Sequence, residues 1–187
     1  MKRAFGIQFI SPHRFSSSGI WPRTFPFLTL AMTFLFATLA ASPKEKANGN
    51  LTYNDKNKSL TSNLKHAYLV KGPHDYEKEK TIRRIIFSPD DISAGLQSAK
   101  SMSGAVAALK DGMTIDFDAG PRLNYWITLK GGLVQYSGTA TLDTFTKTTD
   151  SGEHIAGKLM IDDADAGGPK IDVQFDAPLF KVYRTAR

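Results

Sequence analysis

An acidic turn near the C-terminus contains the residues whose types and spacing best suit chemistry. Asp162, Asp163 and Asp165 place three carboxylates within four positions. Oxygen atoms of carboxylates are the ligands that Ca²⁺ prefers, so the turn is a candidate calcium site. The twelve-residue calcium loop of helix-loop-helix proteins does not fit, because counting from Asp163 the fifth and twelfth positions are Gly167 and Gln174. Asp and Gly also favour ordinary turns, and a solvated hairpin turn is the alternative interpretation.

Trp126 is the second candidate, as an anchor for a ligand or partner. It is the only tryptophan after residue 41. It lies in a strand-like segment, 122–130, whose period-two alternation places it on the polar face, opposite Leu123, Tyr125, Ile127 and Leu129. Three explanations are open: a helix over 89–110 packs on it, it is an isolated exposed side chain, or it contacts a binding partner, as tryptophans at interfaces often do.

Catalysis and cofactors find little support in the remaining motifs. His66, His74 and His154 are far apart and show no metal-binding spacing, and the sequence has no Cys and no GxSxG motif. No glycine-rich phosphate loop precedes a helix-like pattern. We therefore expect that the protein binds no cofactor, and we expect that it is not an enzyme.

Two pairs of carboxylates keep one enzymatic alternative open. Asp116 with Asp118, and Asp172 with Asp176, lie on the polar sides of alternating segments. Two carboxylates about 5–10 Å apart can hydrolyse glycosides. A small hydrolase using such dispersed acids is therefore one alternative function, although alternating strands place acids outward routinely.

The elements that must position these residues are mainly strands. Period-two alternation or short apolar runs predict strands in seven segments, and turn residues such as Gly-Gly and Gly-Pro separate them. We expect a small antiparallel sandwich or meander barrel of about 7–9 strands. The seven segments are 64–71, 82–88, 113–118, 122–130, 133–145, 155–161 and 170–177.

One helix is expected to pack on this sheet, over about 89–110. Ser88, Pro89 and two acids resemble a capped first turn, and the apolar residues that follow recur with helical period. Gly95 and Gly104 weaken the helix, so a break near 101–104 is also expected.

The N-terminal 41 residues have the features of a secretory signal peptide. They contain four basic residues and no acid, followed by an apolar stretch from Phe25 to Ala40. That stretch has about 16 residues, fewer than the roughly 20 of a spanning helix, and small residues follow it, so cleavage after Ala40 or Ala41 is expected. An uncleaved N-terminal membrane anchor is the alternative. Residues 42–50 are expected to be a flexible lead-in, and 51–187 a single β-rich domain.

Charge and composition exclude further classes of function. The net charge of +6 falls to +2 without residues 1–41, because 20 basic and 18 acidic residues remain. No basic patch remains for nucleic acid, and after signal cleavage no segment remains for a membrane. Export without Cys is typical of bacterial envelope proteins rather than of disulfide-stabilised secreted domains.

These observations favour an exported, secreted or periplasmic, non-catalytic binding or assembly module. Its partner would be an unknown protein or small molecule. Besides the small hydrolase, the other alternative is a carrier that holds an apolar small molecule inside a β-barrel, which requires a hollow interior.

Overall fold

A computed structural model describes the chain from Lys46 to Arg187, except for residues 57 and 78. These residues belong to one compact unit. The expected signal peptide (1–41) and the start of the lead-in (42–45) lie outside the described residues. In the part of the chain that the structure describes, no helix is both long and apolar enough to cross a membrane.

Strands dominate the described residues, as the alternation predicts, with two short helices and two 3-10 turns. The strands number ten rather than 7–9, because residues 46–64 contribute two and the segment 133–145 divides into one strand and the start of another. The elements are β1 (Lys46–Asp55), β2 (Lys58–Leu64), β3 (His66–Pro73), β4 (Thr81–Ser88), α1 (Ser93–Ser98), α2 (Met102–Val106), β5 (Gly112–Phe117), β6 (Leu123–Leu129), β7 (Val134–Ala140), η1 (Leu142–Thr144), β8 (Phe145–Asp150), β9 (His154–Asp162), η2 (Ala164–Ala166) and β10 (Lys170–Val182).

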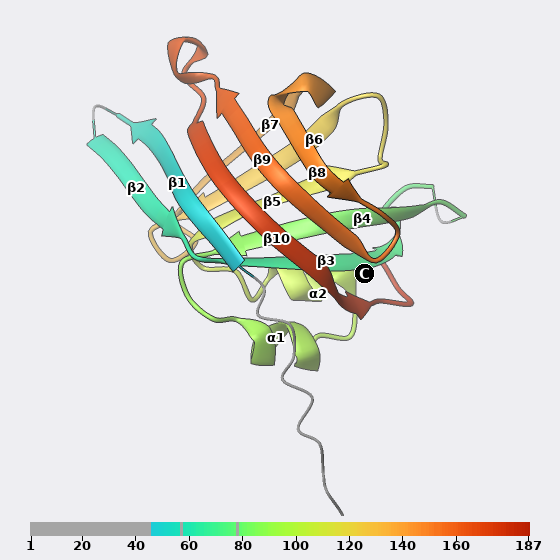
Figure 1. Ribbon diagram of the computed structural model, residues 1–187. Coiled ribbons are helices and arrows are strands. Elements are labelled where there is room, and N and C mark those ends of the chain that lie inside the picture. Colours follow the sequence, from blue (N-terminus) through green and yellow to red (C-terminus); the bar gives the residue numbers. More distant parts are fainter. Residues whose placement is uncertain (1–45, 57, 78) are drawn as a thin grey trace, which may run out of the picture. The chain divides into compact units, whose positions relative to one another are not determined.

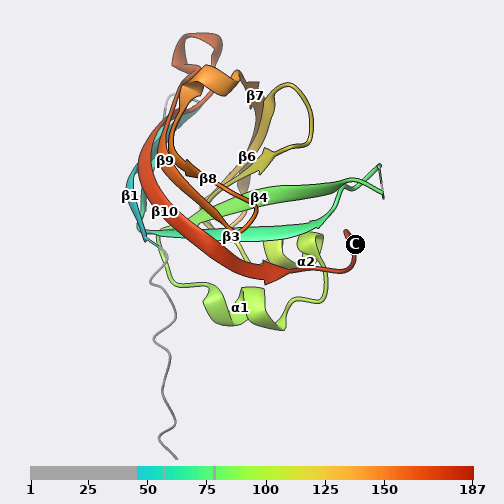
Figure 2. The same cartoon turned by 45° about the vertical axis from the view of Figure 1, so that its right-hand side comes forward.

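The long strand β10 joins two arms of one curled sheet (Figures 1 and 2). Its first half lies between β1 and β9, and the arm that it forms has the order β2-β1-β10-β9-β8. Its second half pairs with β3, and the other arm continues as β3-β4-β5-β6-β7. The β10–β3 pairing is parallel and the other pairings are antiparallel.

The main core fills the space between the two arms. Ile115 is fully buried and Phe175 is 4% exposed, so both lie on the packed faces of their strands as the alternation predicts. The Phe175 ring contacts the rings of Phe87 and Phe145, with centroids 5.1 and 5.6 Å apart. Aromatic and aliphatic side chains from both arms thus meet in one cluster.

A second core lies on the opposite face of the β3–β7 arm, where α1 and α2 cover part of the sheet (Figure 1). Leu96 from α1 and Met102 from α2 pack there against Tyr68 and Ile86 of the sheet. The apolar run Ile85–Phe87 therefore has both of its faces buried, one in each core.

The helical segment expected over 89–110, with a break near 101–104, is present as two short helices that differ from the expectation in where they begin and where the break falls. The first, α1, begins only at Ser93, because Ser88 Oγ accepts a hydrogen bond from the N–H of Asp90 and so closes a turn rather than a helix cap. It ends at Ser98, since Ala99 is extended, and α2 starts after Ser101, whose side chain caps it. The break thus falls slightly earlier than the glycines indicate.

The first strand of the sheet begins before Leu51, within the segment 42–50 that was expected to be a lead-in. Lys46 to Asn50 belong to β1 and pair with Asp176 to Asp172 of β10. The segment has few large apolar residues, so its own pattern is weak, and the neighbouring strand determines its conformation.

Candidate functional site

The strand register gathers polar residues on the helix-side face of the β3–β7 arm. Arg84 of β4 lies opposite Asp116 of β5, and Asp116 lies opposite Asn124 of β6. Two residues away along the same two strands, Thr114 lies opposite Trp126. Because side chains alternate between faces, all five side chains project from the same face as Ile86 and the second core. The sequence thus assembles a polar group of side chains beside an apolar one.

Arg84 and Asp116 form a buried ion pair in this group. Arg84 is 6% exposed and Asp116 is 3% exposed. Nε and Nη2 of Arg84 donate to the two carboxylate oxygens at 2.5 and 2.8 Å. Burial lowers the pKa of the Arg84 guanidinium, but the hydrogen bonds and charge of Asp116 outweigh this effect, so the pKa of Arg84 is raised overall.

Trp126 stands beside this pair and remains accessible. The Arg84 guanidinium carbon lies 5.6 Å from the centroid of the Trp126 ring, which is a cation–π contact. Trp126 is nevertheless 40% exposed, so the expected helix does not bury it. The helices are too short to reach across the face, since α2 ends at Val106.

These residues form the floor of a hollow of about 370 Å³, which we call the Trp126 cleft. The β3–β4 loop supplies one wall and α2 another. His74 fixes the loop, because its Nδ1 accepts hydrogen bonds from the backbone N–H groups of Tyr76 and Glu77 at 3.3 and 3.0 Å. Nε2 therefore carries the ring proton of the neutral side chain. The lining consists of His74, Asp75, Tyr76, Arg84, Ser103, Val106, Thr114, Asp116, Asn124 and Trp126.

Several polar atoms of the cleft have unused hydrogen-bonding capacity. Nη1 of Arg84, the hydroxyl of Thr114 and the amide of Asn124 have no hydrogen-bond partner among the described residues. None of them is a fully buried unpaired atom, so each keeps contact with the open space of the cleft. A donor, a hydroxyl and an amide are thus available to a ligand.

The acidic turn does not gather its carboxylates. Asp162 pairs with Lys170 at 2.7 Å, which lowers the pKa of Asp162, and Asp163 accepts a hydrogen bond from the Tyr125 hydroxyl at 2.5 Å. Asp165 is exposed at η2. Nowhere in the described part of the chain are three His, Cys, Asp or Glu side chains placed to hold a metal ion. The turn instead attaches the β9–β10 connection to β6 through Tyr125.

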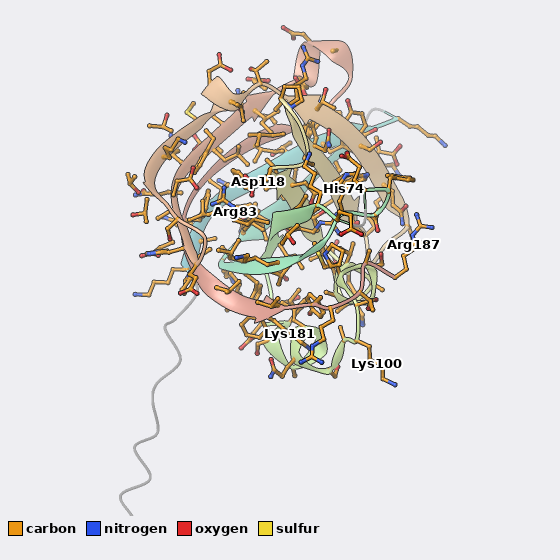
Figure 3. The ribbon with its side chains drawn as sticks, turned by 90° about the vertical axis from the view of Figure 1, so that its right-hand side faces the viewer. His74, Arg83, Lys100, Asp118, Lys181 and Arg187 are labelled. Carbon is orange, nitrogen blue, oxygen red and sulfur yellow. The ribbon has the colours of Figure 1, made fainter. Side chains whose placement is uncertain are left out.

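The paired carboxylates are separated by their cations. Asp118 has a φ of 67°, which ends the alternation of β5, and it pairs with Arg83 (Figure 3). Asp116 pairs instead with Arg84. Asp172 pairs with Lys158 at 3.1 Å, and Asp176 pairs with His154 at 2.5 Å. Each acid therefore has its own basic partner, an arrangement that does not resemble two carboxylates flanking a glycosidic bond.

The interior between the two arms is packed rather than hollow. Leu51, Leu69, Ile85, Tyr125 and Val173 are fully buried there and pack with the phenylalanine cluster. This packing gives no support to a carrier that encloses a ligand in the barrel, since such a carrier needs empty space at that position.

Comparisons with protein-family models, with curated proteins and with solved structures find no match for this chain.

The sequence reasoning found Trp126 but missed the Arg84–Asp116 pair. The signal for Arg84 was present: period two places it on the same face as Ile82 and Ile86, which are both buried. A charge flanked by buried residues on its own face needs an opposite charge nearby. Its partner could not be read from the sequence, because the register between β4 and β5 decides it.

Proposed function

We propose that this protein is an exported, non-catalytic envelope protein that works as a binding module, with the Trp126 cleft as its ligand-binding surface. The observation that carries the proposal is the position of Trp126. A large aromatic ring remains exposed on the floor of a cleft, in contact with a buried arginine. Tryptophan and arginine are, with tyrosine, the side chains enriched at the energetic centres of protein interfaces.

The buried ion pair supports binding rather than stability as the role of this face. Replacing a buried ion pair by apolar residues of similar size is often neutral or stabilising, by about 1–4 kcal/mol. The second core lies next to the pair and could have been extended with such residues. An ion pair that holds Arg84 rigidly beneath Trp126, with Nη1 still accessible, instead presents a fixed donor to a ligand.

Export rests on the leader and is tested separately. The basic start, the short apolar stretch and the small residues behind it favour cleavage after Ala40 or Ala41. N-terminal sequencing of the protein recovered from cells should give a chain that starts at Ala41 or Ser42. A chain that starts at Met1 and sediments with membranes would replace export by the anchor.

Cosedimentation with isolated cell envelopes of the producing bacterium tests the binding function. The protein should sediment with the envelopes, and Trp126→Ala should reduce the bound fraction strongly while the protein stays folded. Met160→Ala is the matched control, since Met160 is 53% exposed and lies on β9, outside the cleft. Equal sedimentation of the Trp126→Ala and Met160→Ala variants would exclude the cleft as the binding surface.

A further inference from the structure

The Trp126 ring separates two hollows on one face of the sheet. On one side lies the Trp126 cleft. On the other lies a hollow of about 630 Å³ between α2 and the edge strand β7, which we call the β7 hollow; its lining includes Lys110, Thr128, Gln135, Tyr136 and Ser137. Trp126 and Val106 line both. A ligand that used both hollows would be elongated and would cross the face of the tryptophan ring.

Hydroxyl and amide groups surround this ring on both sides. In the cleft, Nη1 of Arg84, the hydroxyl of Thr114 and the amide of Asn124 have no partner within the described chain. In the β7 hollow, the hydroxyls of Thr128 and Ser137 likewise form no hydrogen bond with any described residue. Hydroxyl and amide groups can both donate and accept, so they suit a ligand whose own groups do both.

The charges that line the cleft are already neutralised. Asp116 pairs with Arg84. Asp75, the other acidic residue of the lining, has its Oδ1 atom 3.8 Å from Nε of Arg187. Within the Trp126 cleft, a charged ligand would have to break one of these pairs or would lack a counter-charge; the cation Lys110, unpaired among the described residues, lines the β7 hollow instead. The cleft therefore fits an uncharged ligand.

Resting on the binding function proposed above, we infer that the two hollows bind a neutral β-1,4-linked glycan chain, with one pyranose ring stacked on Trp126. A pyranose with equatorial substituents presents a flat C–H face, which suits contact with an aromatic ring. Its hydroxyl groups project from the edge of that face, where they both donate and accept hydrogen bonds. Equatorial 1,4-linkages keep the chain extended, so that neighbouring sugars reach the two hollows.

An extended peptide is the less favoured occupant. Peptides that bind to sheets commonly add a strand at a sheet edge, where main-chain groups form hydrogen bonds. The floor of the Trp126 cleft is instead the face of β4, β5 and β6, whose edges are already paired with neighbouring strands. Side-chain groups, rather than an open backbone, are offered to the ligand.

Isothermal titration calorimetry of the protein with cellotetraose and with chitotetraose tests the inference. At least one of them should bind, and Trp126→Ala should weaken binding by about tenfold or more. Trp126→Phe keeps a flat ring and should lose less, and Met160→Ala should bind as the unaltered protein does. Asn124→Ala and Thr114→Val should each weaken binding several-fold.

Fluorescence gives an independent measurement of the stacking. The chain has two tryptophans, so a Trp21→Phe background leaves Trp126 as the only one. The emission of Trp126 should shift on addition of the β-linked tetrasaccharide that binds, and maltotetraose, whose α-linkages bend the chain, should have a weaker effect.

The outcomes distinguish the ligand class from the binding function. Absence of binding by both β-linked tetrasaccharides at about 1 mM would overturn the glycan inference. If envelope binding still depended on Trp126 in that case, the proposed function would stand with another ligand. Loss of envelope binding after protease treatment of the envelopes would point to a protein partner and also overturn the glycan. Tetrasaccharide binding that Trp126→Ala leaves unchanged would overturn the site.

Discussion

Asp91 shows how one side chain fixes the entry into the helical layer. Its carboxylate accepts a hydrogen bond from the Tyr68 hydroxyl at 2.8 Å and from the N–H of Ser93 at 2.9 Å. The Tyr68 hydroxyl in turn accepts from the N–H of Ile92 at 3.2 Å. The first turn of α1 is thus attached to a buried residue of β3. Hydrogen bonding from the Ser93 side chain, then from the Ser93 N–H and the Tyr68 hydroxyl, lowers the pKa of Asp91 from 3.8 to about 2.

The lowered pKa predicts a stability that depends on pH in acid. A carboxylate with a lower pKa in the folded state contributes its full stabilisation above its unfolded pKa, and loses it as the pH falls through the folded pKa. Between about pH 4 and pH 2, the unaltered protein should therefore lose more free energy of unfolding than Asp91→Asn does. Denaturant titrations across this range measure the difference. Asp90→Asn is the control, and parallel losses in all three proteins would contradict the prediction.

For single residues, the sequence predicted which side chains matter more often than which groups they contact. Trp126 was identified because period two alone assigns a residue to a face. Asp91 was expected to act inside a helix that begins at Pro89, but it acts just before the helix, on a tyrosine 23 positions earlier. The carboxylates of the acidic turn were candidates for one calcium site, with a solvated turn as the alternative, and the structure gives Asp162 and Asp163 different partners, Lys170 and Tyr125. Contacts between distant segments follow from register and packing, which a single sequence does not contain.

The strand β1 illustrates what decides an element that lacks a strong pattern. Its first half is polar, and it forms because β10 offers an unpaired edge. Gly49 lies directly against β10: a Cβ at this position would collide with the backbone of Asp172 and Val173. A glycine in a flexible lead-in would have no such constraint.

Gly49→Ala should therefore destabilise the protein, although Ala is normally tolerated in a flexible segment. The clash with the backbone of β10 would force β1 away and expose part of the main core, at a cost of roughly 1–3 kcal/mol as for other overpacked sites. Gly120→Ala is the matched control, since no atom lies within 4 Å of a Cβ built there. Thermal and urea denaturation of both variants measure the effect. Equal stability of the two would mean that residues 46–50 do not hold the position that β1 gives them.

Strands with clear alternation were predicted well, because burying one face determines both the conformation and the register of a strand. The segments at β5, β6, β9 and β10 match the structure within a few residues of their ends, apart from the extension of β10 to Val182. The pattern could not reveal that β10 continues past Pro178 and changes its neighbour, since that depends on where β3 lies.

The folded unit over the described residues is organised around β10, which takes part in both arms and reaches both cores. Phe175, in its first half, lies in the main core, and Tyr183, directly after the strand, lies in the second core. Lys181 ties the same segment to α1, since its Nζ donates to the carbonyls of Gln97 at 2.6 Å and Ala99 at 2.8 Å (Figure 3). The Tyr183 hydroxyl donates to the carbonyl of Leu96 at 2.7 Å. The helices are therefore attached to the strand that stabilises the sheet.

This connection predicts that the two cores unfold together. Phe175→Ala, in the main core, should cost about 3–5 kcal/mol, and Leu96→Ala, in the second core, about 2–5 kcal/mol. If β10 couples the cores, each substitution should lower the midpoint of one common transition. Urea unfolding followed by far-ultraviolet circular dichroism, which reports the strands, and by Trp126 fluorescence, which reports the helix-side face, should give coincident curves in both variants.

Conservative substitutions keep this prediction testable if either alanine variant fails to fold. Phe175→Leu and Leu96→Val remove less volume and should shift the same transition by smaller amounts, because the residual cavity is smaller. Separate transitions would have a definite signature: Leu96→Val would move the fluorescence curve to lower urea and leave the circular dichroism curve in place. In that case the helical layer would be an independent unit resting on the sheet, and the hydrogen bonds of Lys181 and Tyr183 would not couple it to the main core.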